Sequence, residues 1–99
     1  MAEKQLIVVA EMAARAGKEA ELEERLLALI EPTRKEEGCN EYLLHRSTKE
    51  PGRFVFYENW NCAESLDRHL ASPHMKDFLN TVGTLLEEPP RIAGYERIA

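Results

Sequence analysis

Residues 54–78 read FVFYENWNCAESLDRHLASPHMKDF, and this stretch does most to decide how the chain folds. It begins with Phe54 and Phe56 at alternate positions and ends in Glu58 and Trp60, a pattern typical of a β-strand with one buried face. A short helix that carries His69 follows, with Asn61 as its predicted N-cap. The Ser-Pro pair at 72 and 73 suits the cap and first position of another helix. The pattern therefore predicts a strand that passes directly into two helices.

Beyond this stretch the second helix continues and a last strand follows. Apolar residues recur at helical spacing, and they are Met75, Phe78, Leu79, Val82, Leu85 and Leu86. The prolines at 89 and 90 are expected to end the helix. Residues 91–98 then predict a strand, with an irregularity at Gly94.

The residues before this stretch predict a strand and a helix. Residues 5–12, QLIVVAEM, are apolar on both faces of the predicted strand. An amphipathic helix opens at Gly17, and its apolar stripe comprises Leu22, Leu26, Leu29 and Ile30. We expect Pro32 to bend or weaken its last turn and Gly38 to adopt a left-handed cap.

A β-hairpin completes the set of elements. Residues 39–48 and 53–60 are both extended in pattern, and the connecting KEPG at 49–52 has turn chemistry. The full order is strand, helix, strand, strand, helix, strand. This βαββαβ order predicts a ferredoxin-like α+β fold, with a four-stranded antiparallel sheet covered on one face by helices. The 99 residues suffice for a single domain, 1–99.

The apolar first strand bears on assembly. Two helices cover only one face of a sheet, so Ile7 and Val9, or their neighbours, would be left on the other face with Val55 and Tyr57. Soluble monomers rarely expose an apolar patch of this kind. We therefore expect a homodimer that packs sheet against sheet, as in dimeric α/β barrels.

Composition excludes several classes of partner. A formal charge of −5 argues against nucleic acid and against an anionic membrane surface, which both require a basic face. No apolar run approaches the roughly 20 residues that span a bilayer. The sequence thus favours a cytoplasmic protein.

Cofactor motifs are also absent from the sequence. The two cysteines, Cys39 and Cys62, form no CxxC pair, and we expect reduced, buried thiols near each other across the hairpin. The spacing of the three histidines does not resemble a zinc site, and the five glycines do not form a phosphate loop. We expect no metal, flavin, haem or nucleotide cofactor.

Two candidate site residues lie at the end of the strand 53–60. Glu58 and Trp60 are two positions apart and share a face, which is the face under the helices if Phe54 and Phe56 point there. A carboxylate at that place would need a hydrogen-bond partner. Glu58 is equally compatible with a half-solvated rim position, and Trp60 with ordinary core packing.

The histidines are the candidate bases. His69 lies on the apolar side of its helix, which packs back over Glu58 and Trp60. A lone histidine there is often structural, but a neutral imidazole is also what a general base requires. His74 lies in the first turn of the next helix, where it is either a second pocket residue or a solvated one. A pocket wall from the second strand would draw on Tyr42, Arg46 and His45, depending on register.

Taken together, these residues resemble the antibiotic biosynthesis monooxygenase family. The resemblance rests on Gly38-Cys39 and Tyr42, on the strand with Phe54, Glu58 and Trp60, and on L-x-x-H-x-x-S-x-H-x-x-x-F over residues 66–78. It implies a cofactor-free oxygenase that uses O₂ and a small phenolic or quinol-like substrate. It also implies His69 as proton acceptor or orienting group, Trp60 as pocket wall and Glu58 as hydrogen-bond partner.

Other functions stay open at this level. The family resemblance also covers isomerases of a small signal molecule and catalytically silent, dimeric binding or stress-response proteins. Convergent polar groups around Trp60 would favour an enzyme, whereas a closed, apolar cavity would favour a binding protein.

Overall fold

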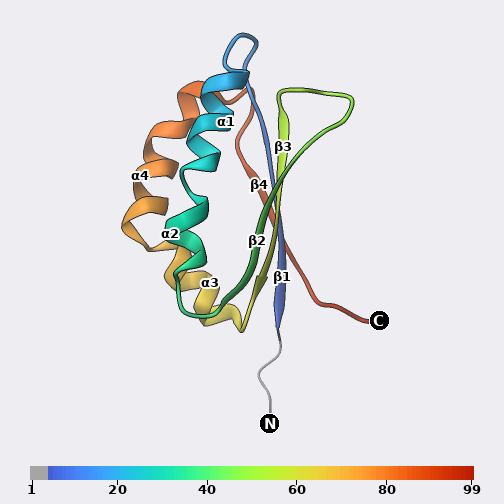
Figure 1. Cartoon of the computed structure of the whole chain (residues 1–99), viewed down its shortest axis with the longest axis vertical. Helices are drawn as coiled ribbons and strands as arrows, with labels where there is room; N and C mark the ends of the chain where they lie inside the picture. Colours follow the sequence, from blue (N-terminus) through green and yellow to red (C-terminus); the bar gives the residue numbers. More distant parts are fainter. Residues whose placement is uncertain (1–4) are drawn as a thin grey trace.

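The computed structural model describes residues 5–99, which form one four-stranded sheet with helices against it. The strands are β1 (Leu6–Ala13), β2 (Cys39–Arg46), β3 (Arg53–Trp60) and β4 (Arg91–Tyr95). The helices are α1 (Glu19–Leu27), α2 (Ile30–Arg34), α3 (Ala63–Leu70) and α4 (Pro73–Thr81), and a 3₁₀ turn, η1 (Val82–Leu85), extends α4. Figure 1 shows all of the helices on one side of the sheet.

The sheet has the order β2-β3-β1-β4, and every neighbouring pair is antiparallel. β1 is therefore a central strand, which is the condition on which the predicted apolar outer face depended. This arrangement confirms the ferredoxin-like fold. Within residues 5–99, no helix is both long enough and apolar enough to span a membrane.

Strict alternation along β3 separates the core from the outer face. Its even-numbered side chains, from Phe54 to Trp60, are buried, and the odd-numbered ones are only partly covered. The pairing of Tyr42 with Glu58 settles the register of the hairpin. Tyr42 consequently faces the helices, whereas His45, which pairs with Val55, faces away from them.

The first predicted helix is divided in two. α1 ends at Leu27 and α2 begins at Ile30, so the break falls before Pro32 rather than after it. Proline has no N–H to bond back to residue 28, and it fits the first turn of a new helix. Four residues after α2, Gly38 has the expected positive φ of 89°.

Other local predictions need correction. The N-cap of α3 is Cys62, not Asn61, whose side chain instead accepts a hydrogen bond from Asn40 at 2.9 Å. Ser72 is the N-cap of α4 but its hydroxyl donates to the carbonyl of His69, so it caps no helix N–H. β4 is shorter than predicted, and Gly94 pairs regularly with Val8.

The cysteines are free thiols, as expected, but both are half-buried rather than fully buried. Cys39 opens β2 opposite Trp60, next to a register shift between Cys39 and Glu41. Cys62 lies 3.5 Å from the hydroxyl of Ser65.

Candidate active site

His69 is the buried centre of the candidate site. It is 1% exposed and projects from α3 toward β3, where its ring centroid lies 4.7 Å from that of Trp60. The ring of Tyr42 approaches it edge-on at 5.6 Å. Apolar packing of α3 places a titratable ring between two aromatic side chains, inside the core.

Glu36 holds this histidine in place, and sequence reasoning missed it. Its carboxylate Oε2 lies 2.8 Å from Nδ1 of His69 and 2.8 Å from Nε2 of His74. Glu36 belongs to the loop between α2 and β2, which has no periodicity from which to predict a contact. The one available signal was Gly38, because a glycine two residues after Glu36 indicates a tight, left-handed turn that can bring the loop close to another element.

Close packing at Gly38 explains how Glu36 reaches His69. A Cβ on Gly38 would overlap the side chain of Ser65, so the loop lies against the first turn of α3. Ser65 and His69 are one helical turn apart and share a face. The loop that touches Ser65 therefore places the side chain of Glu36 beside His69, one turn further along α3.

The hydrogen bond to Glu36 sets the tautomer of His69. A carboxylate only accepts, so Nδ1 of His69 carries the proton and Nε2 keeps its lone pair. Burial lowers the pKa of His69, against the opposing effect of Glu36 and with a smaller contribution from His74 in the same direction. His69 is therefore a neutral imidazole at pH 7, with a free acceptor nitrogen.

Glu58 is a second acid of the site, and it is buried. It is 4% exposed, and its Oε1 accepts a hydrogen bond of 2.9 Å from the indole of Trp60. Burial raises the pKa of Glu58 to about 7, the Trp60 hydrogen bond lowers it and the charge of Glu36 raises it further. This carboxyl can thus donate or accept a proton near neutral pH.

Tyr42, on β2, is the third polar residue beside His69 and Glu58. Its ring stacks on Phe56 with centroids 4.4 Å apart, and it pairs directly with Glu58 across the sheet. Burial raises the pKa of Tyr42, and the charge of Glu58 adds to that effect. Tyr42 consequently stays a neutral phenol at physiological pH.

A narrow, mostly apolar cavity brings these groups together. Its volume is about 20 Å³, enough for about one water molecule. Glu58, His69 and Tyr42 supply its polar groups. The remaining wall is apolar and comes from β1, β3, β4, the helices and the junction between α1 and α2: Ala10, Met12, Leu29, Phe56, Leu66, Leu70, Met75, Phe78, Leu79 and Ile92.

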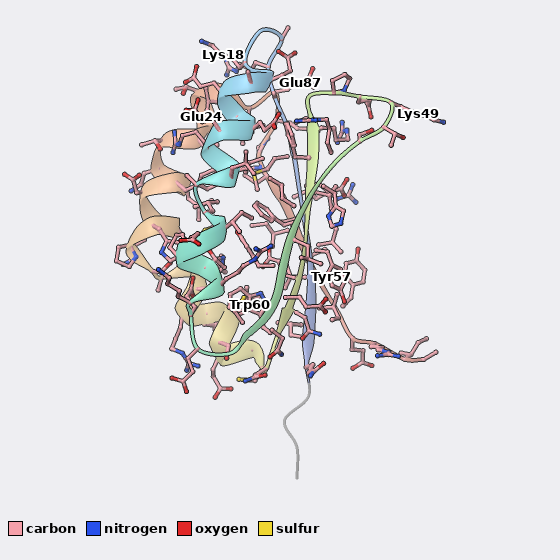
Figure 2. All side chains as sticks on the ribbon, viewed as in Figure 1. Lys18, Glu24, Lys49, Tyr57, Trp60 and Glu87 are labelled. Atoms are coloured by element: carbon pink, nitrogen blue, oxygen red, sulfur yellow. The ribbon has the colours of Figure 1, made fainter. Side chains whose placement is uncertain are left out.

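Three other predicted site residues do not line this cavity. Trp60 is fully buried behind His69, on the helix side of the sheet (Figure 2). His74 lies on the far side of Glu36, with Thr33 and Ser72 hydroxyls each 3.3 Å from its Nε2. Arg46 forms an ion pair with Glu23 and lies over the ring of Phe54.

The side chains of Glu36, His69 and His74 are also a possible set of metal ligands. Their ligand atoms all lie within 4.8 Å of one another. The polar groups of the cavity support proton transfer, and this adjoining cluster supports cation binding.

Comparison with known proteins gives consistent matches. The family model "Antibiotic biosynthesis monooxygenase" matches residues 5–81. Rv0793 of Mycobacterium tuberculosis is 37% identical over 82 residues, which cover 83% of this chain and 80% of that protein. The Escherichia coli protein named "Probable quinol monooxygenase YgiN" is 35% identical over 100 residues, covering 88% of this chain and 94% of that protein.

Solved structures show the same fold. PA3566 from Pseudomonas aeruginosa superposes with a TM-score of 0.94 at 30% identity, covering 100% of this chain and 99% of that one. The structure of Rv0793 has a TM-score of 0.91 at 32% identity and covers 96% of both chains.

Proposed function

This chain belongs to the antibiotic biosynthesis monooxygenase family, and we propose that it is a cofactor-independent monooxygenase of a small phenolic or quinol-like substrate. One observation carries the proposal. His69 is buried in the wall of an apolar cavity, and Glu36 fixes the tautomer that leaves Nε2 free to accept a proton. The name of the relative YgiN supports a quinol as the substrate class.

The proposed reaction starts with proton transfer. Nε2 of His69 takes the proton of a substrate hydroxyl, which leaves an electron-rich anion. A ring carbon of that anion bonds to O₂, which is reduced by the two electrons of the new bond, and His69 returns the proton to the peroxide. Loss of water then breaks the O–O bond and removes the hydrogen of that carbon. The carbon that bore the hydroxyl and the carbon that bonded to O₂ both end as carbonyl groups, and one water molecule is released.

Glu58 has the geometry to orient the substrate. Oε1 of Glu58 is taken by Trp60, so Oε2 is the oxygen left for a substrate hydroxyl. Tyr42 lines the same cavity, but its hydroxyl interacts with the side chain of Thr33, so its ring contributes the shape of the wall. The apolar side chains around Glu58 strengthen its hydrogen bond, because water does not compete for the same group.

The substrate needs more space than the cavity now has. A volume of about 20 Å³ is far smaller than a phenol ring. Leu79 and Ile92 line the cavity and are 40% and 44% exposed, so they mark its open side. We infer that a substrate arrives between α4 and β4 and displaces these two side chains.

Oxygen consumption tests the proposal directly. Metal-free protein should consume O₂ when it is mixed with a quinol or anthrone panel, and His69→Ala should reduce turnover about 10²–10⁴-fold. His45→Ala is the matched control, since His45 lies on the opposite face of the sheet. Full activity of His69→Ala, or no consumption above buffer with any substrate, would contradict the proposal.

The pH dependence of kcat/KM identifies the base. The pKa of His69 is lowered, so a reaction that depends on His69 should lose activity only below pH ~6.5. A reaction that depends on ionised Glu58 should instead lose activity below about pH 7. The loss of kcat/KM at low pH is therefore compared in wild-type and Glu58→Gln proteins. The same pH dependence in both proteins indicates His69 as the base.

The narrow cavity favours a second candidate, a dimeric small-molecule-binding protein without catalysis. In that case an aromatic ligand would quench Trp60 fluorescence, because the indole lies directly behind His69. The same ligand would cause no O₂ consumption. Parallel measurement of quenching and O₂ consumption therefore separates the two functions.

A further inference from the structure

We propose that Glu36, His69 and His74 form a binding site for a divalent transition metal of the Zn²⁺ type. The proposal begins with geometry. Oε2 of Glu36 lies 2.8 Å from each of the two ring nitrogens, and the three ligand atoms lie within 4.8 Å of one another. Zinc bonds of about 2.0–2.2 Å place tetrahedral ligand atoms about 3.3 Å apart. Small shifts of the side chains would therefore convert the cluster into a coordination shell.

The residues that must move have room to do so. The side chains of Glu36 and His74 are 16% and 23% exposed, whereas that of His69 is only 2% exposed. His69 thus supplies a fixed ligand, and the other two residues adjust to the ion. The partly exposed side also gives the ion a path from solvent.

The ligand set fits the chemistry of such an ion. Two imidazoles and one carboxylate are a recurrent set for Zn²⁺ and related metals, and they leave a position for water. The hydroxyls of Thr33 and Ser72 each lie 3.3 Å from Nε2 of His74. They are well placed to hydrogen-bond a water molecule that completes the coordination.

Metal binding would have a consequence for catalysis, which rests on the proposed function. An ion on Nδ1 of His69 replaces the proton there, so the neutral ring must carry its proton on Nε2. Nε2 would then be a hydrogen-bond donor and would no longer accept a substrate proton. A metal ion bound to this cluster would thus inhibit the enzyme, because the proposed base is one of its ligands.

Calorimetry with Zn²⁺ tests the site without any substrate. EDTA-treated protein should bind one Zn²⁺ per chain, and His74→Ala should weaken binding by at least about 10-fold. Co²⁺ should give the visible absorption of a site with nitrogen and oxygen ligands. His45→Ala is the matched control, since His45 is exposed on the other face of the sheet. Circular dichroism and His74→Gln check that a loss of binding does not reflect unfolding.

The outcomes separate the site from its effect. Absence of binding to wild-type protein, or equal affinity in wild-type, His74→Ala and His74→Gln, would overturn the site. If the enzyme is active, Zn²⁺ should inhibit wild type, and His74→Ala should show a ratio of activity with and without Zn²⁺ near one. Stoichiometric binding without inhibition would overturn only the proposed change of tautomer at His69, and the metal site itself would stand. Because binding is measured without turnover, failure of the proposed oxygenase function would leave the test of the site intact.

Discussion

At the scale of single residues, the site depends on a hydrogen-bonded pair from distant parts of the chain. His69 and Glu36 are 33 positions apart, yet their side chains meet at 2.8 Å. The histidine alone would be one more buried aromatic ring. Its partner gives it a defined tautomer, which is what turns a core residue into a candidate base.

Glu36→Gln should therefore impair catalysis without removing a bulky group. A glutamine side chain can donate to Nδ1, which would move the histidine proton to Nε2 and occupy the reactive nitrogen. We expect turnover of metal-free enzyme to fall about 10²-fold or more, with little change in KM. Glu37→Gln, at the neighbouring exposed position, is the control and should behave as wild type. Equal activities of the two variants would show that Glu36 does not position the base.

Glu58→Gln should change how stability depends on pH. The pKa of Glu58 is raised from 4.5 to about 7, so the folded state holds this proton more tightly than the unfolded state. Its contribution to stability is present below pH ~4.5 and is lost as pH rises through about 7, a loss on the order of 3 kcal/mol. Glutamine does not titrate, so the variant should lack this loss.

Urea unfolding at pH 5 and pH 8 measures the effect of Glu58. Other groups also titrate in this range, and His69 acts in the opposite direction because its pKa is lowered. The difference between wild type and variant is therefore the quantity to compare. Glu41→Gln, at an exposed position on β2, serves as the control. If the free energy of unfolding changes equally with pH in wild type and Glu58→Gln, Glu58 has an ordinary pKa.

At the scale of elements, the site is built where a loop lies against a helix. Gly38 has a φ of 89°, and Ser65 lies where its side chain would be. α3 can therefore approach the start of β2 only because residue 38 has no Cβ. That approach brings Glu36 to His69, so packing of the two elements and assembly of the site depend on the same contact.

Gly38→Ala should destabilise the fold more than other glycine substitutions. Its Cβ would lie 2.7 Å from that of Ser65, and the left-handed backbone adds strain, for a combined cost of about 2–3 kcal/mol or more. Gly17→Ala has a similar φ of 86° but open space, so it should cost about 1 kcal/mol. Gly83→Ala has neither problem and should be close to neutral. Urea midpoints rank the three variants, and similar values for all of them would exclude the close contact as the cause.

At the scale of the whole molecule, the sheet has one covered and one uncovered face. Figure 2 shows Tyr57 on the side away from the helices, where Val9 pairs with it. Val9 and Tyr57 are only partly covered, whereas Val8 and Phe56 beside them are buried. Leu43 and Tyr95, which are 38% and 55% exposed, extend this apolar face across β2 and β4.

Val9→Asp should dissociate a homodimer that packs through this face. Burial of an unpaired carboxylate at a sheet interface costs several kcal/mol, so dimer formation should fail at micromolar concentration. Sedimentation of wild type should give twice the chain mass of 11.3 kDa, and the variant should give the chain mass itself. Leu27→Asp, at an exposed apolar position of α1, is the control and should remain dimeric. A monomeric wild type would contradict the expected dimer.

What the sequence determined by itself was the set of elements and the faces of the strands. Alternation along residues 54–60 and helical spacing beyond Met75 reflect local geometry, so they predicted the fold and the shared face of Glu58 and Trp60. Whether Glu58 is buried was left open by the sequence, and the structure shows that it is buried. Helix ends were less predictable. Asn61 was a plausible cap, but its side-chain oxygen accepts a hydrogen bond from Asn40, near the start of β2.

Only the tertiary structure decided which side chains meet. The contact of Glu36 with His69 joins a loop to a helix and follows from the close packing of Gly38 on Ser65. The contact of His74 with Glu36 joins α4 to the same loop, and the hairpin register places Tyr42 in the cavity and His45 outside it. Hydrophobic periodicity reports which face of an element is buried. It does not report which polar groups lie opposite one another across the core, because that depends on how the elements pack.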